Sequence, residues 1–234
     1  MIDFENKLKE NLKEYHQVLQ EPALEIYQLY KNGNKNQAAE LFLKTIFVPR
    51  KTFLEILGQK GLNYGSSAGF INEWIFYHLI NTLITTEKLT NIVVKNNEPI
   101  DFKWKKEGHK KIKVDICVKS EKPKRILYCI EIKTNFDDGF SNYLKQEKQL
   151  YHHRSRHYKD FRYHYIAFSN IPNEISKKFK RKLKTLERRK ELWELPDKEI
   201  KNSSSIKLNP KLIEKGQNLL SLLYEPLLKS KNDS

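Results

Sequence analysis

The sequence predicts a mixed α/β (α+β) fold, in which a central mixed β-sheet is flanked by helices and preceded by a helical N-terminal region. Two observations lead to this prediction. The expected elements follow the order helices, hairpin-rich strands, helix, strand and helix, which is typical of a sheet with both antiparallel and parallel pairs. The 234 residues also include twelve Tyr, twelve Phe and three Trp, which favours a folded core over disorder.

The first part of the chain, residues 1–68, is predicted to be helical and to pack on the core. Apolar residues recur at helical spacing over residues 3–59, and prolines and an Asn-Gly-Asn turn divide this stretch into three or four pieces. Four glycines between residues 58 and 69 predict a loop. A long, strongly apolar helix is then expected at about 69–85.

Strands dominate the next part of the chain. Apolar segments predict strands at 91–96, 100–106, 111–118 and 125–133, and turn-forming residues from Ser120 to Pro123 join the last two as a hairpin. Periodicity predicts four later elements and a linker: a helix at about 141–158, a strand at 163–168, a basic helix at about 174–192, a polar linker at 196–210 and an amphipathic helix at about 211–229. The apolar stripe of the last helix is expected to pack in the core, with a dimer interface as the alternative.

The charge of the chain points to an anionic partner. The 44 Lys and Arg residues outnumber the 29 Asp and Glu residues and give a formal net charge of +15. DNA or RNA is the leading partner for such a chain. The alternative is that a genomic bias toward Lys, Asn and Ile produces this charge, which then serves no ligand.

Other features of composition predict a cytoplasmic protein. No run of about 18 apolar residues is present, so no membrane span is expected. The N-terminus is acidic and helical, unlike a signal peptide. Cys117 and Cys129 are too few for a disulfide framework or a thiolate zinc site, and both are expected to be reduced and buried in strands.

Three charged residues interrupt two apolar strands. Glu131 and Lys133 alternate with Ile130 and Ile132, so both charged side chains lie on the same face of the strand. Asp115 breaks the preceding apolar segment. Because buried charges are costly unless they are paired or bind a metal, the sequence predicts that two carboxylates and a lysine converge on one sheet face. Such a group suits metal-assisted cleavage of a phosphodiester.

The spacing of these residues resembles the PD-(D/E)xK nuclease superfamily, in which an Asp at the start or bend of one strand precedes Glu-x-Lys on the next. The resemblance covers about residues 70–170. The proline that names the motif is absent, since Val114 precedes Asp115. The resemblance implies a restriction-endonuclease-like fold, with a nuclease core at 69–195 and a linker and C-terminal helix at 196–234.

The same resemblance implies a role for each residue. Asp115 and Glu131 are expected to bind Mg²⁺, with Mn²⁺ as an alternative, together with the Ile132 backbone carbonyl and water. Lys133 is expected to orient or deprotonate that water and to stabilise developing charge. The alternative is an ion pair at a sheet edge without a catalytic role.

Glu73 is the fourth catalytic and metal-binding candidate. It lies in the predicted 69–85 helix on a face shared with the apolar residues Tyr77, Ile80 and Ile84, where a carboxylate needs a compensating cation. In many members of the superfamily a helix before the sheet supplies an acidic residue to the metal. The alternative is an ion pair with Lys or Arg of the N-terminal helices.

Two helices are candidates for DNA binding. Lys145, Gln149, His152 and Arg156 follow helical spacing along one face of the helix after the motif, which in the superfamily lies beside the substrate. The basic 174–192 helix adds further candidates, among them Lys177 and Lys178. A solvated charged face is the alternative in both helices.

The sequence therefore predicts a Mg²⁺-dependent endonuclease of double-stranded DNA, of the Type II restriction class. A homodimer is expected, because two strands require two active sites. The alternatives are a DNA repair or structure-selective nuclease of the same superfamily and a non-catalytic basic DNA-binding protein.

Overall fold

The computed structural model describes residues 19–45, 64–96, 99–104, 108–137, 139–157, 161–196 and 208–232 of the chain. Within these ranges the structure describes only the backbone of residues 64–70, 100–111, 151–157 and 232. None of the described helices is both long enough and apolar enough to cross a membrane.

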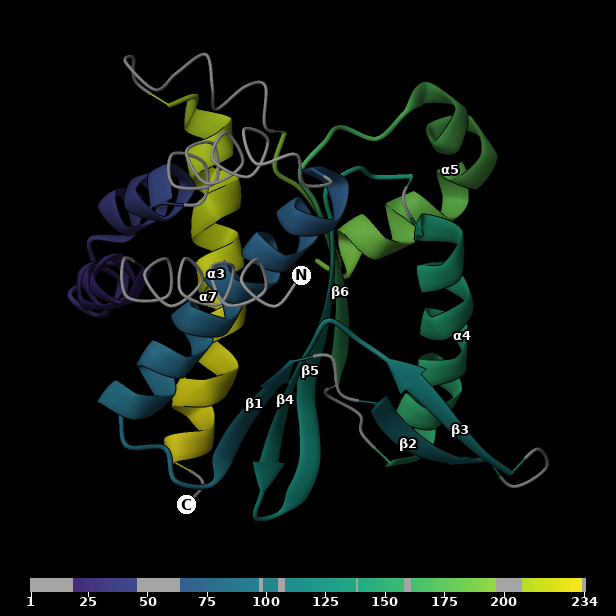
Figure 1. The fold of residues 1–234 in the computed structure, drawn as a ribbon, viewed down its shortest axis with the longest axis horizontal. Coiled ribbons are helices and arrows are strands. Elements are labelled where there is room, and N and C mark those ends of the chain that lie inside the picture. The colour runs from purple at the N-terminus through teal and green to yellow at the C-terminus, as the bar shows by residue number, and fades with distance from the viewer. Residues whose placement is uncertain are drawn as a thin grey trace, which may run out of the picture.

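The described elements form three layers, with a sheet between two layers of helices (Figure 1). The central sheet has five strands in the order β1-β4-β5-β6-β7. The strands of this sheet are β1 (Ile92–Asn96), β4 (Ile116–Glu121), β5 (Lys124–Lys133), β6 (Arg162–Ala167) and β7 (Leu192–Glu194). β1, β4 and β5 pair antiparallel, whereas β5, β6 and β7 pair parallel. The predicted mixed sheet flanked by helices, with helices at the N-terminus, is confirmed.

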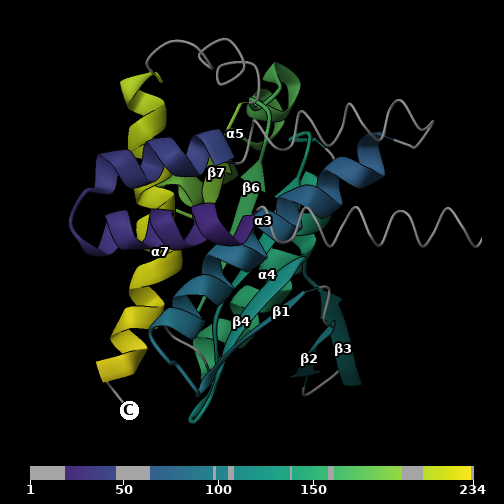
Figure 2. The same ribbon diagram turned by 60° about the vertical axis from the view of Figure 1, so that its left-hand side comes forward.

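The helices divide between the two faces of the sheet. One layer contains helical residues 19–31 and 35–45 together with α3 (Tyr64–Thr86) and α7 (Pro210–Asn232). The other contains α4 (Phe140–His157) and α5 (Asn173–Arg188). Figure 2 shows the first layer from the side, with the two N-terminal helices lying across α7.

A smaller sheet stands apart from the main one. β2 (Pro99–Trp104) and β3 (Gly108–Lys113) pair antiparallel as a two-stranded ribbon that leads into β4 (Figure 1). The sequence predicted one strand at 111–118, and this was wrong. The chain bends at Val114 and Asp115, so residues on the two sides of the bend join different sheets.

Three further boundaries differ from the prediction. α3 begins at Tyr64, so the glycines at 65 and 69 belong to a helix rather than to a loop. α5 ends at Arg188, and Lys190 follows with a φ of 56°. Leu192, the last residue of the predicted helix, begins the short strand β7, which was not predicted because three residues are too few to show a strand period. Most of the predicted 196–210 linker lies outside the described residues.

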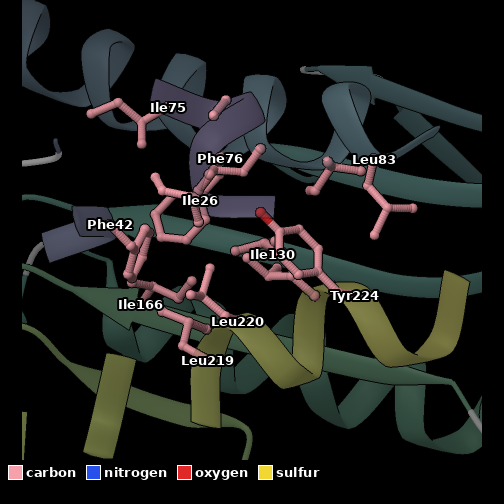
Figure 3. Packing of buried hydrophobic residues seen from close by; sticks show 14 of the residues in the cluster. Ile26, Phe42, Ile75, Phe76, Leu83, Ile130, Ile166, Leu219, Leu220 and Tyr224 are labelled. Carbon is pink, nitrogen blue, oxygen red and sulfur yellow. The ribbon is translucent and has the colours of Figure 1, made fainter. Parts of the chain in front are cut away.

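The first hydrophobic layer joins helical residues 19–31 and 35–45, α3 and α7 to the sheet. Ile130 of β5 and Ile166 of β6 meet Leu220 and Tyr224 of α7 and Phe76 of α3, and all five are fully buried (Figure 3). The apolar stripe of α7 therefore packs in the core, as the first of the two predicted alternatives has it.

Close approach of two helices in this layer depends on small residues. A Cβ added at Gly216 of α7 would lie 3.3 Å from the Ala39 Cβ and 3.3 Å from the Leu43 Cδ1. That spacing is tighter than most side-chain contacts, so glycine lets α7 and helical residues 35–45 approach each other.

The second hydrophobic layer holds α4 and α5 against the other face of the sheet. Aromatic rings fill much of it, and Tyr143 of α4 lies 4.7 Å from Tyr163 and 4.9 Å from Tyr165 of β6 between ring centroids. Cys117 and Cys129 are paired across β4 and β5 in this layer, with their sulfur atoms 3.5 Å apart as free thiols. The prediction that both are buried in strands is confirmed.

Glu87 ties three helices together at the end of α3. Its carboxylate accepts hydrogen bonds from the Tyr27 hydroxyl at 2.7 Å, the Lys31 ammonium at 2.6 Å and the Lys231 ammonium at 2.8 Å. The hydrogen bonds from Lys231, then Lys31 and Tyr27, lower the pKa of Glu87 from 4.5 to about 2. Because the folded-state pKa is the lower one, this carboxylate stabilises the fold above about pH 4.5 and ceases to do so as the pH falls toward 2.

We therefore predict that Glu87→Gln lowers the free energy of unfolding by about 1–3 kcal/mol at neutral pH, because it removes a charged acceptor from three donors. The difference from wild type should shrink as the pH falls below about 4.5. Chemical denaturation followed by circular dichroism measures both effects. Glu40→Gln is the matched control, because the Glu40 side chain is 43% exposed and pairs with Lys44 only at 4.0 Å. Equal losses in the two variants would contradict the role of Glu87.

Candidate active site

Asp115 lies at the point where β4 begins beside the longer strand β5. The paired register starts at Ile116 and Ile130, so the ladder of β4 does not extend to Ile132. The Asp115 Oδ2 instead accepts a hydrogen bond from the Ile132 N–H at 2.6 Å. A side chain thus replaces a missing strand partner, and this contact fixes the carboxylate beside the end of β5.

Lys133 lies between the two carboxylates. Its ammonium is 3.2 Å from the Asp115 Oδ2 and 2.7 Å from the Glu131 Oε1. The side chains of Lys133, Asp115 and Glu131 are 24%, 14% and 10% exposed, so the group is half-buried but reachable from solvent. The structure brings together the three residues that the sequence predicted would converge.

Burial and charge set the protonation of this group. Burial, and then the charge of Asp115, raise the pKa of Glu131 above its ordinary value, although Lys133 counteracts them. Burial alone would lower the pKa of Lys133, but the two carboxylates and their hydrogen bonds outweigh it and hold the pKa above the ordinary lysine value. Lys133 is therefore a cation at neutral pH.

Two further residues reach the group from neighbouring elements. The Tyr163 hydroxyl of β6 lies 3.1 Å from the Glu131 Oε2 and 2.7 Å from the Gln146 Oε1 of α4. Neither residue was predicted from the sequence to belong to the site. The tyrosine hydroxyl in the predicted 163–168 strand could have suggested a polar contact. To use it, however, one had to know that β6 pairs with β5 in parallel register.

The loop after β5 shapes the edge of the site. Phe136 is held by two hydrogen bonds, since its N–H donates to the Ser169 Oγ at 2.7 Å and its carbonyl accepts from the Tyr165 hydroxyl at 2.6 Å. Gly139 has a φ of 93°, and a Cβ there would touch the stem of Lys133 at 3.4 Å. Glycine at this position thus leaves room for the stem of Lys133.

Glu73 belongs to the other layer. It is half-buried on α3, whose buried residues pack on the face of the sheet opposite to α4. In the described part of the chain, the hydrogen bonds and ion pairs of Asp115, Glu131 and Lys133 do not include Glu73, which has other interactions. Its role as a metal ligand stays a prediction.

The predicted DNA-binding residues of α4 have different environments. Lys145 is exposed and Gln149 is half-buried. His152 and Arg156 lie on the last part of α4, where the side chains are outside the described set. α4, which carries the face proposed for DNA, follows Lys133 in the chain after one short loop.

The basic residues of α5 serve two purposes. Lys177 and Lys178 are exposed, in keeping with a surface for phosphates. Lys182 of α5 and Arg189, directly after it, instead bind the buried carboxylate of Glu147, at 2.6 Å and 3.0 Å, and so join α5 to α4. Part of the positive charge that the sequence shows in this helix is thus neutralised inside the protein.

The donor set is compatible with Mg²⁺. The described residues include no cluster of three or more His, Cys, Asp and Glu side chains that could hold a metal ion. Mg²⁺, however, is commonly held by one or two carboxylates, and water and substrate phosphates complete its coordination. The N–H and C=O of one residue in an antiparallel strand face the same neighbour, so we expect the Ile132 carbonyl to lie on the Asp115 side.

Comparisons with known proteins give little further information. No protein family model matches the sequence, and no curated protein matches it. Among solved structures, protein VC1899 from Vibrio cholerae is similar with a TM-score of 0.41 at 12% sequence identity, over 89% of this chain and 57% of that chain. The chain thus spans somewhat more than half the length of VC1899.

We predict that Asp115→Ala and Asp115→Asn differ in stability. Alanine leaves the Ile132 N–H without its acceptor, which costs about 1–3 kcal/mol, partly offset by relief of repulsion with Glu131. Asparagine keeps an acceptor oxygen and should cost less. Urea denaturation measures both, with Asp137→Ala as control for an exposed carboxylate in the following loop. Wild-type stability of Asp115→Ala would show that this hydrogen bond does not support the fold.

Proposed function

We propose that the protein is a Mg²⁺-dependent endonuclease that hydrolyses phosphodiester bonds of double-stranded DNA. The observation that supports this proposal is the group formed by Asp115, Glu131 and Lys133, in which two carboxylates and a cation share one half-buried position at the end of β5. Simple binding of phosphate does not require acidic side chains, so a basic DNA-binding protein has no use for this group.

The proposed roles follow from the contacts. Asp115, Glu131 and the Ile132 carbonyl hold the ion, which when bound supplies an acidified water and polarises the scissile phosphate. Lys133 leaves at least one of its two carboxylates and presents its ammonium to the phosphate or to the attacking water. Since both carboxylates keep Lys133 charged, the proposed role is stabilisation of negative charge rather than removal of a proton.

The proposed DNA surface consists of α4 and α5 beside this group. Exposed Lys145, Lys177 and Lys178 supply positive charge there, and the whole chain carries a net charge of +15. Within the nuclease class we propose a sequence-specific Type II restriction enzyme that acts as a homodimer, since two active sites cut two strands. Digestion of phage DNA with Mg²⁺ tests this: discrete bands support it, whereas a smear or selective cutting of branched substrates indicates another nuclease of the same superfamily.

We predict that Asp115→Asn and Glu131→Gln abolish cleavage while DNA binding survives, because each removes a charged oxygen ligand but no positive charge. Lys133→Ala should slow single-turnover cleavage by at least about a hundredfold. Rapid-quench assays on a labelled duplex measure the rates, and gel shifts in Ca²⁺ measure binding. Asp137→Asn is the control and should cleave at the wild-type rate. Robust cleavage by either carboxylate variant would refute the assignment.

We further predict a strongly salt-dependent affinity for DNA. Each neutralised phosphate contributes about −0.9 to the slope of log affinity against log salt, so a dimer that contacts about six to ten phosphates loses about three to five decades between 50 and 200 mM salt. Fluorescence anisotropy in Ca²⁺ measures the slope without cleavage.

Single substitutions locate the surface. Lys145→Ala or Lys177→Ala should weaken binding to all sequences alike and reduce the slope by about one unit. Lys211→Ala is the matched control, because Lys211 is an exposed lysine of α7 on the other side of the sheet. An equal effect of Lys211→Ala, or none from Lys145→Ala and Lys177→Ala together, would place the DNA elsewhere.

A further inference from the structure

Tyr163 is a buried residue, and its hydroxyl has no role in the proposed mechanism. Its side chain is almost fully buried in the aromatic layer under α4, yet the hydroxyl is placed between Glu131, at 3.1 Å, and Gln146, at 2.7 Å. A tyrosine needed only for packing could be a phenylalanine. The hydroxyl is therefore in position to act on one or both of these partners.

The hydrogen-bond chemistry orders the three groups. A phenol carries one proton and donates it to one acceptor at a time. If the Gln146 amide presents its Nε2 to the phenol oxygen, that oxygen accepts from the amide and the proton of Tyr163 is available to the Glu131 Oε2. The result is a chain of two hydrogen bonds that runs from α4 through β6 to the carboxylate on β5.

The two oxygens of Glu131 are held by different partners. Lys133 contacts Oε1 at 2.7 Å, whereas Tyr163 contacts Oε2. When Lys133 turns toward a phosphate, its contact with Oε1 is lost and the carboxylate would be able to rotate. The Tyr163 contact to Oε2 does not involve Lys133, so it can hold the carboxylate in place after that movement.

We infer that Tyr163 is a positioning residue, which holds the Glu131 carboxylate in the orientation that binds the divalent cation, and that Gln146 acts through Tyr163. The inference rests on the proposed function, because it assigns a partner to the carboxylate of that same site. Removal of a residue that hydrogen-bonds a metal ligand commonly weakens metal affinity about 10–100-fold.

Tyr163→Phe tests the inference, since it removes the hydroxyl and keeps the ring. We expect about tenfold weaker binding of Mn²⁺ to the free protein, measured by electron paramagnetic resonance of unbound Mn²⁺, and a similar rise in the Mg²⁺ concentration for half-maximal cleavage. Cleavage at saturating Mg²⁺ should fall much less. Tyr128→Phe is the matched control, because this buried hydroxyl donates to the Leu223 carbonyl at 3.0 Å on the opposite face; its Mn²⁺ affinity should equal that of wild type.

Gln146→Leu supplies a second, independent measurement. It should weaken Mn²⁺ binding in the same direction but less than Tyr163→Phe, and the double variant should be no weaker than Tyr163→Phe alone, since Gln146 acts through the phenol. If Tyr163→Phe fails to fold by circular dichroism, weakened Mn²⁺ binding in Gln146→Leu carries the test. Additive losses in the double variant would overturn the part assigned to Gln146.

The outcomes separate the inference from the proposed function. Wild-type Mn²⁺ affinity in a folded Tyr163→Phe, or in Gln146→Leu where Tyr163→Phe does not fold, would overturn the inference and leave the nuclease proposal intact. Absence of both Mn²⁺ binding and cleavage in the wild-type protein would overturn both. Weaker Mn²⁺ binding in Tyr163→Phe, with Tyr128→Phe unchanged, supports both.

Discussion

The hydrogen bond from the Ile132 N–H to the Asp115 carboxylate is the contact on which the candidate site depends. β5 continues beyond the paired end of β4, so its backbone would face a missing partner there. Asp115 supplies one at 2.6 Å, and that requirement places a carboxylate beside Glu131. Two neighbouring carboxylates repel, and burial raises the pKa of Glu131 further. Lys133 makes the arrangement tolerable, because its ammonium contacts both within 3.2 Å.

The parts of this site that lie within one hairpin could be predicted from the sequence. Alternation along β5 puts Glu131 and Lys133 on one face whatever the rest of the fold does. Asp115 was identified because a charge in an apolar segment needs a reason. The mixed sheet followed from the order of the elements. In each case the signal is local, since strand period and chain order do not depend on distant partners.

The parts that depend on distant contacts could not be predicted. Tyr163 and Gln146 reach Glu131 only because β6 pairs in parallel with β5 and α4 lies across them. Lys182 and Arg189 look like surface charges in the sequence, but the buried Glu147 carboxylate binds both. The bend before β4 was missed for a similar reason, because β-forming residues lie on both sides of Asp115 and only the pairing partners show that they belong to different sheets.

The position of Lys133 has a consequence for how the protein matures. Many small metalloproteins remain unfolded until an ion neutralises their ligands. In this chain a covalently attached ammonium already balances one of the two carboxylate charges, so the sheet can close during synthesis without any ion. For the proposed nuclease, binding of metal would then be an event separate from the folding of the chain. A chelator would silence such an enzyme without unfolding it.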